Sequence, residues 1–186
     1  MVTDGSSEIK EAVAVLESGG IIAYPTEGVF GLGCDPGNAG ALERILQIKQ
    51  RDAAKGLILA ASELNQLLPY IEPFSDIVES RVLPTWPGPV TWIVPAKTDT
   101  SSILTGGRKT LAVRVSNHPV IAALCGTFGQ AIVSTSANLA GDPPCLSAKE
   151  TQTRLGEHVD LVIHAETGNH SGATKIMDAA SGERIR

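Results

Sequence analysis

The chain has 186 residues, of which 42% are hydrophobic and 19% charged, so it is long enough for a sizeable core and too apolar to be disordered. Its formal net charge at pH 7 is −5 and only 4% of its residues are aromatic, which argues against a protein that coats nucleic acid or stacks bases on an aromatic platform. A local group of cations on such an acidic chain instead indicates a small anionic ligand.

Cysteine usage indicates the compartment. Cys34, Cys125 and Cys145 lie far apart, with neither a CxxC pair nor a Cys/His zinc spacing, and the histidines show no metal-ligand grouping. Such sparse usage is typical of a reducing compartment. The polar N-terminus is unlike a signal peptide, and no stretch approaches the roughly 20 apolar residues of a membrane span. We therefore expect a cytoplasmic protein without a membrane segment or a metal site of its own.

Hydrophobic periodicity, caps and breakers predict the elements of the first half of the chain. In chain order they are a helix over 9–16, a strand over 21–24, a glycine-punctuated loop over 25–36, a helix over 39–49 capped by Asn38, a strand over 57–60, and short helices over 62–68 and 75–83.

The second half begins with the segment 84–89, which is too rich in proline for regular structure. The predicted elements after it are strands over 90–94 and 110–115 joined by a polar loop, a helix over 119–128, a strand over 131–134, a helix over 147–155 with a capping box, and strands over 161–163 and 174–178. Because some strands follow one another without a helix between them, we expect one α/β domain over 1–186, built on a twisted open mixed sheet flanked by helices.

Three cations, Lys49, Arg51 and Lys55, lie between an amphipathic helix and an apolar strand. Such junctions are where α/β proteins place ligand sites. Cations are also favoured in the last turn of a helix, because they complement the negative end of its dipole. The stretch alone is therefore explained by either a ligand site or a helix end.

Arg114 lies in the predicted strand 110–115 and shares one face with Thr110 and Ala112. A charged side chain within an apolar strand is costly unless it is paired or faces a cavity. We therefore expect either a carboxylate partner or a ligand phosphate for Arg114.

The polar residues Ser134, Thr135, Ser136 and Asn138 directly follow an apolar strand. Such residues favour turns, but three hydroxyls and an amide at the carboxyl end of a strand favour a site. A serine nucleophile is the further alternative; it would need an oriented base, and no GxSxG elbow surrounds these serines.

The glycines of the loop 25–36 allow the backbone to approach a ligand, although their spacing is not GxGxxG and the chain has no Walker A motif. Glu27 is the nearest carboxylate. We expect it to be a solvated surface residue, with a role as a Mg²⁺ ligand as the alternative.

Six blocks follow one another along the chain: Tyr24-Pro25-Thr26-Glu27, Gly31-Leu32-Gly33-Cys34-Asp35-Pro36, Lys49-Gln50-Arg51, Trp86-Pro87-Gly88-Pro89-Val90-Thr91, Leu111-Ala112-Val113-Arg114-Val115 and Ser134-Thr135-Ser136-Ala137-Asn138. With these blocks the chain closely resembles the YrdC/TsaC family, the threonylcarbamoyl-AMP synthases, over nearly its whole length. The pairing of a KxR with a distant SxN, here Lys49/Arg51 with Ser136/Asn138, is that family's signature.

The resemblance implies a YrdC-like fold with a basic concave cavity and a nucleotidyltransferase activity. L-Threonine, bicarbonate or CO₂ and ATP would give threonylcarbamoyl-AMP and pyrophosphate, normally with Mg²⁺. A separate tRNA-modifying complex would use the product for the threonylcarbamoyladenosine modification of tRNA.

The resemblance also implies roles for individual residues. Those implied to bind ATP are Lys49, Arg51, Lys55, Ser136 and Asn138, with Lys49 and Arg51 catalytic. Those implied to bind threonine are Thr26, Arg114, Ser134 and Thr135.

The chain departs from many relatives at Gly28-Val29-Phe30, where they have Thr-Val-Tyr, and at Ala60, where longer relatives have a histidine. It continues after Asp178 only to Arg186. We therefore expect a cavity without the linker that covers it in longer relatives.

The alternative function is a module that binds structured or double-stranded RNA weakly on the same concave surface. The acidic net charge of the chain argues against this alternative.

Overall fold

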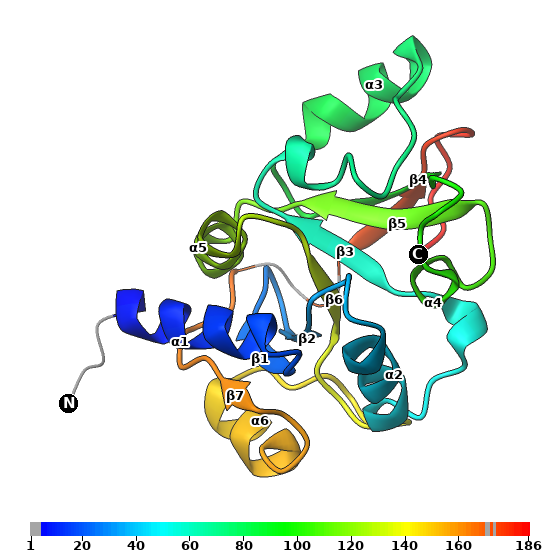
Figure 1. The fold of residues 1–186 in the computed structure, drawn as a ribbon. Coiled ribbons are helices and arrows are strands. Elements are labelled where there is room, and N and C mark those ends of the chain that lie inside the picture. Colours follow the sequence, from blue (N-terminus) through cyan, green and yellow to red (C-terminus); the bar gives the residue numbers. More distant parts are fainter. Residues whose placement is uncertain (1–4, 170–171, 173) are drawn as a thin grey trace.

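A computed structural model of the protein describes residues 5–169, 172 and 174–186, which form an open 8-stranded sheet flanked by helices (Figure 1). The strands are β1 (Ile22–Pro25), β2 (Phe30–Gly33), β3 (Ile58–Ala61), β4 (Val90–Pro95), β5 (Thr110–Val115), β6 (Ile132–Ser136), β7 (Leu161–Val162) and β8 (Lys175–Asp178). Their order in the sheet is β7-β1-β2-β6-β3-β5-β4-β8. The pairs β1–β7, β3–β5 and β4–β8 are parallel and the others antiparallel, which confirms the predicted open mixed sheet.

The helices are α1 (Gly5–Glu17), α2 (Ala39–Ile48), α3 (Asp76–Val82), α4 (Ser102–Thr105), α5 (Pro119–Phe128) and α6 (Ala148–Leu155). Short 3-10 turns are η1 (Ala53–Lys55), η2 (Leu64–Gln66) and η3 (Leu83–Thr85). The predicted caps are confirmed: the side chain of Asn38 accepts a hydrogen bond from the Ala41 amide, and that of Ser147 accepts one from the Glu150 amide.

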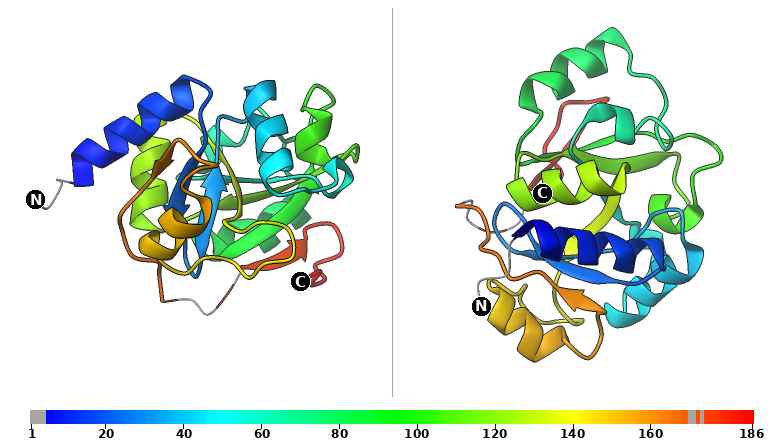
Figure 2. Two further views of the ribbon diagram at one scale, coloured as in Figure 1. Left: turned by 90° about the horizontal axis from the view of Figure 1, so that it is seen from below. Right: turned by 60° about the vertical axis from the view of Figure 1, so that its left-hand side comes forward.

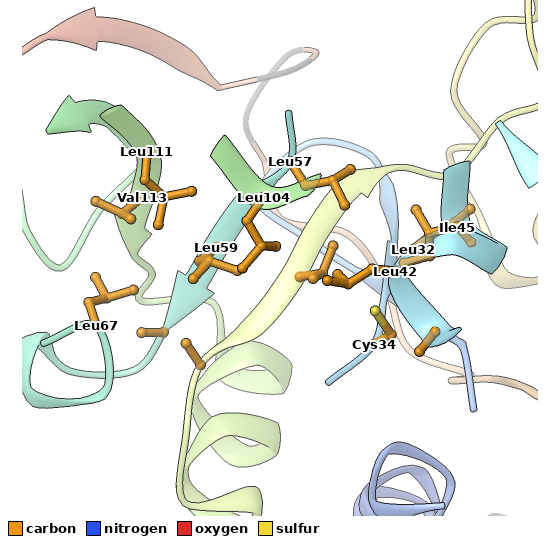
Figure 3. Close-up of a cluster of buried hydrophobic side chains, with 14 of the residues drawn as sticks. Leu32, Cys34, Leu42, Ile45, Leu57, Leu59, Leu67, Leu104, Leu111 and Val113 are labelled. Carbon is orange, nitrogen blue, oxygen red and sulfur yellow. The ribbon is translucent and has the colours of Figure 1, made fainter. Parts of the chain in front are cut away.

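The sheet has a hydrophobic cluster on each face. Helices α1 and α5 lie side by side over one face (Figure 2), where they pack on Ile22 and Tyr24 of β1. On the other face, Leu42 and Ile45 of α2 lie beside Leu32 of β2 (Figure 3). Strand β1 is buried on both sides, so successive residues enter opposite clusters.

Strand β2 lies within the segment 25–36, for which a loop was predicted. It pairs antiparallel with β1, with Gly33 opposite Ile22 and Gly31 opposite Tyr24. Its glycines make room for a ring, since a Cβ on Gly33 would lie 2.6 Å from Cε1 of Tyr24 and 2.8 Å from the Val133 carbonyl oxygen. The prediction was wrong because these glycines are needed for close packing within a strand and do not mark a turn.

Three further segments differ from prediction. The expected helix over 62–68 is reduced to the turn η2. The turn η3 includes the first two residues of the proline-rich segment 84–89, for which no regular structure was expected. The polar loop between β4 and β5 contains the short helix α4. None of the helices in the described part of the chain has the length and apolar character needed to cross a membrane.

Candidate active site

A cavity of about 290 Å³ is lined by residues of strands β2, β3, β4, β5, β6 and β8 and the loops beside them. This volume is near the lower end for small-molecule sites. The cationic residues that line it are Arg51, Lys55, Arg108, Arg114 and Arg186. The described residues that line it include no Asp or Glu. Since the chain as a whole has a net charge of −5, this concentration of positive charge suits a ligand with several negative charges.

The cavity brings together most of the site residues predicted from the sequence. Those that line it are Thr26, Arg51, Lys55, Arg114, Ser134, Thr135 and Ser136. Lys49 and Asn138 are not among the lining residues. Segments far apart in the chain thus contribute both the cations and the hydroxyl groups of one site.

Strand β5 presents Arg114 to the cavity together with Thr110 and Ala112, as its alternation predicted. The guanidinium group also has a carboxylate partner, since its Nη2 lies 3.3 Å from Oε2 of Glu27. Its Nη1 donates to Oγ1 of Thr174 at 2.9 Å. Arg114 therefore has a carboxylate partner and also faces the cavity.

Glu27 is buried, and the expectation that it is a solvated surface residue was wrong. Its side chain is 7% exposed, and its Oε1 accepts a hydrogen bond of 2.6 Å from Oγ of Ser116. The loop after β7 packs on this turn, because a Cβ on Gly168 would lie 2.7 Å from the Glu27 carbonyl oxygen. The charge of Arg114, which is distant in sequence, makes the burial of this carboxylate possible.

A polar network continues from Glu27 to the start of α5. Oγ of Ser116 accepts a hydrogen bond from the His118 amide at 3.0 Å. Nδ1 of His118 accepts one from the Val120 amide at 3.3 Å and so caps α5. Burial lowers the pKa of His118, although Glu27 acts in the opposite direction. The imidazole is therefore neutral at pH 7, the state in which Nδ1 can accept a hydrogen bond.

Lys49 lies at the C-terminal end of α2, where its ammonium group contacts the SxN segment. Nζ lies 2.6 Å from the Ser136 carbonyl oxygen and 3.2 Å from Oγ of Ser136. It also lies 3.2 Å from the Asn138 carbonyl oxygen and 2.6 Å from Oδ1 of Asn138. An ammonium group has three N–H donors, so these four oxygens use all of them. Burial, and to a smaller extent the charge of Arg51, lowers the pKa of Lys49 to about 8.

Gln50 separates the two cations of the KxR motif and has a φ of 43°, in the left-handed region. The chain turns there at the end of α2, and the Arg51 amide donates to the Leu46 carbonyl oxygen at 3.0 Å. Lys49 therefore contacts Ser136 and Asn138, while Arg51 lines the cavity. The KxR and SxN motifs, distant in sequence, are thus in direct contact through Lys49.

No group of at least three His, Cys, Asp or Glu side chains is close enough to hold a metal within the described ranges. Glu27, the carboxylate considered as a Mg²⁺ ligand, is paired with Arg114 and does not line the cavity.

Three residues that line the cavity were not predicted from the sequence: Arg108, Thr174 and Arg186. No local pattern marks them, because they reach the cavity only when the β4–β5 loop and the C-terminal segment fold back. The amide of Ile185 donates to the Ile176 carbonyl oxygen at 2.8 Å, which brings the C-terminal segment onto β8. This segment contributes Ile185 and Arg186 to the cavity wall, which the expectation of an uncovered cavity did not include.

The charges of Arg108 and Arg186 act on Arg51. Its pKa is lowered first by burial and then by Arg186 and Arg108. The Nε of Arg51 is buried and has no hydrogen-bond partner. Like charges gathered in this way, with no Asp or Glu among the described lining residues, favour binding of an anion.

Known proteins are similar to this chain over nearly its whole length. A family model named Sua5_yciO_yrdC, with the description "Telomere recombination", matches residues 14–186. A protein of Photobacterium profundum named threonylcarbamoyl-AMP synthase is 50% identical over 96% of this chain and 97% of its own. A protein of the same name from Nitrosococcus oceani is 48% identical over 96% of each chain.

Solved structures share the fold. The crystal structure of P. abyssi Sua5 complexed with L-threonine has a TM-score of 0.87 and 27% identity, covering 93% of this chain but only 51% of that one. The crystal structure of E. coli YciO has a TM-score of 0.81 and 30% identity, covering 93% of this chain and 84% of that one. Since the family model matches far more than half of the residues and the relatives are about half identical over nearly the whole chain, this protein belongs to the Sua5/YciO/YrdC family.

Proposed function

We propose that the protein is a threonylcarbamoyl-AMP synthase, which joins L-threonine, bicarbonate or CO₂ and ATP and releases pyrophosphate. The observation that carries the proposal is the cavity, which is lined by five cationic side chains and, among described residues, by no Asp or Glu. Relatives of that name that are about half identical over nearly the whole chain support it.

At one end of the proposed site, Arg51, Lys55 and Arg186 bind the polyphosphate of ATP. A guanidinium group can donate two parallel hydrogen bonds to phosphate oxygens, which gives Arg51 a role that a lysine does not fill equally well. Ser136 hydrogen-bonds the nucleotide. Lys49 and Asn138 act from behind the cavity, since their mutual contacts fix the segment that carries Ser136.

At the other end, Arg114 binds the carboxylate of threonine, and Thr26, Ser134 and Thr135 surround the amino acid. The Oγ1 of Thr26 already donates to the Val29 carbonyl oxygen at 2.7 Å, so towards a ligand it can only accept. A hydroxyl that accepts is suited to the N–H groups of the threonine amine. This assignment places the two anionic groups of the substrates on different arginines.

The reaction needs a neutral amine, which attacks CO₂ and releases one proton to water to form a carbamate. A carbamate oxygen then attacks the α-phosphorus of ATP, and the P–O bond to pyrophosphate breaks. The cations orient the polyphosphate and stabilise the charge that grows on the leaving oxygens. Mg²⁺ would be held by the phosphates of ATP and would neutralise part of their charge. In the cytoplasm, a separate tRNA-modifying complex then consumes the product.

Binding of structured RNA on the same surface has less support. The cations line a cavity of about 290 Å³, whereas a double-stranded RNA domain contacts phosphates across about 16 base pairs.

The test is pyrophosphate release by the purified protein with ATP, measured with and without L-threonine and bicarbonate. We expect release only when both are present, together with labelled bicarbonate in an acid-labile adenylate. Release that does not depend on threonine, or none at all from a folded protein, would refute the proposed function.

A further inference from the structure

Arg108 ties the loop between β4 and β5 to the loop that carries the cavity cations Arg51 and Lys55. Its Nη1 donates to the Ala54 carbonyl oxygen at 2.6 Å, and its Nη2 donates to the Lys55 carbonyl oxygen at 3.0 Å. Both acceptors lie in the turn η1, which Asp52 separates from Arg51. The planar guanidinium group thus holds two consecutive carbonyl groups at once.

The two loops also meet backbone to backbone through a pair of glycines. Gly56 has a φ of 65° and Gly106 a φ of 64°. A Cβ on Gly56 would lie 2.7 Å from the Leu104 carbonyl oxygen, and one on Gly106 would lie 2.5 Å from the Ala54 carbonyl oxygen. The Leu57 amide donates to the Leu104 carbonyl oxygen at 2.9 Å. The contact therefore depends on the absence of side chains at both glycines.

The hydrophobic core fixes one side of this contact. Leu104 and Leu57 are both buried in the cluster shown in Figure 3, so the segment around α4 cannot move freely relative to β3. Arg51 and Lys55, by contrast, extend from the loop into a cavity that has no Asp or Glu among its described lining residues. Repulsion between Arg51 and the nearby cations Arg186 and Arg108 favours an open loop when no anion is bound, and the hydrogen bonds from Arg108 to the loop oppose that opening.

We propose that Arg108 is a positioning residue, which holds the loop 51–56 in the conformation that presents Arg51 and Lys55 to a polyphosphate. The proposal rests on the proposed function only in that ATP is the anion bound at this end. Arg108 acts through the loop: the contacts that carry this role are to carbonyl groups of the protein. Its effect should therefore be specific for ATP and should not extend to threonine.

Three variants distinguish positioning of the loop 51–56 by Arg108 from a direct effect of the Arg108 charge on the ligand. Arg108→Lys keeps the positive charge but cannot hold two carbonyl groups with one planar fork. Arg108→Ala removes both the charge and the fork. Lys109→Ala is the matched control, because it removes an exposed charge from the next residue, which does not line the cavity.

The measurements are the Kd of ATP by calorimetry without threonine, and KM for ATP and for threonine in the full reaction. We expect Arg108→Lys and Arg108→Ala each to weaken ATP binding about tenfold, since each loses charge-assisted hydrogen bonds. KM for threonine should change less than about twofold, and Lys109→Ala should bind ATP like the unmodified protein. Trypsin should cleave after Arg51 or Lys55 faster in the two Arg108 variants, and ATP should slow that cleavage.

Other outcomes decide against the proposal. If Arg108→Lys binds ATP normally and only Arg108→Ala is weak, the charge acts directly on the ligand and the positioning role is refuted. Equal losses in KM for ATP and threonine would show a general structural defect, and normal binding by both variants would show no role. Failure of the proposed function is distinguishable, because the unmodified protein would then bind neither ATP nor inorganic triphosphate.

Discussion

Glu27 and Arg114 form a buried ion pair beside the cavity, with 3.3 Å between Oε2 and Nη2 and side chains that are 7% and 4% exposed. Oε2 of Glu27 and Nε of Arg114 have no hydrogen-bond partner. Each charge therefore depends on the other, and removal of one leaves the second buried without compensation.

We predict that Glu27→Gln lowers the free energy of unfolding by about 3 kcal/mol, because it leaves the Arg114 charge buried without a counter-charge. Urea unfolding measures this loss. The control is Glu150→Gln, which removes the same charge from the exposed pair between Glu150 and Arg154 and should change stability far less. Equal losses in the two variants would contradict the importance of burial for the pair.

Arg51→Lys should lower the rate of adenylate formation roughly 30- to 1,000-fold while the protein stays folded. The loss of a bidentate contact to the polyphosphate in the transition state corresponds to about 2–4 kcal/mol. Pyrophosphate release measures the rate, and the unfolding midpoint shows that the fold is kept. Arg44→Lys, the same change at a residue that pairs with Asp160 outside the cavity, should leave turnover unchanged. Near-normal turnover in Arg51→Lys would rule out this role.

Gly106→Ala should destabilise the protein more than Gly107→Ala. Both positions have a positive φ, 64° and 74°, so both variants lose about 1–2 kcal/mol to backbone strain. A Cβ at Gly107 meets nothing within 4 Å, whereas one at Gly106 would lie 2.5 Å from the Ala54 carbonyl oxygen. The clash should add about 1–3 kcal/mol, visible in chemical unfolding. Similar stability of the two variants would mean that the loops separate at little cost.

The N-terminus of α5 should lose stability in mild acid through His118. Burial lowers the pKa of His118 in the folded state, while in the unfolded state it is near 6.5. As the pH falls below about 6.5, the unfolded chain therefore binds more protons than the folded one, and the free energy of unfolding decreases until the pH passes the lowered folded value. Protonation of Nδ1 also removes the acceptor that caps the Val120 amide.

We test this prediction with His118→Asn, because asparagine is a good N-cap that does not titrate in this range. Between pH 7.5 and 5.5 the unmodified protein should lose stability more steeply than the variant. Parallel stability curves for the two proteins would show that His118 does not contribute to the acid sensitivity.

Features that depend only on neighbouring residues could be predicted from the amino-acid sequence. The alternation over Thr110–Val115 predicted both the strand and the face on which Arg114 lies. The caps at Asn38 and Ser147 were predicted because a cap bonds amides only a few residues away. The resemblance carried by the motifs with Lys49/Arg51 and Ser136/Asn138 identified the family, since these residues occur in a recognisable order.

The contacts of each charged group, in contrast, are known only from the folded structure. Glu27 was expected at the surface. Its burial could not be predicted, because its buried partner, Arg114, lies on a distant strand. Lys49 meets Ser136 and Asn138 only in the folded protein, where oxygens of both residues surround its ammonium group. Burial and charge pairing depend on contacts between segments far apart in the chain. The free energy of a charged group changes strongly with burial and with nearby charges, and a local sequence pattern specifies neither.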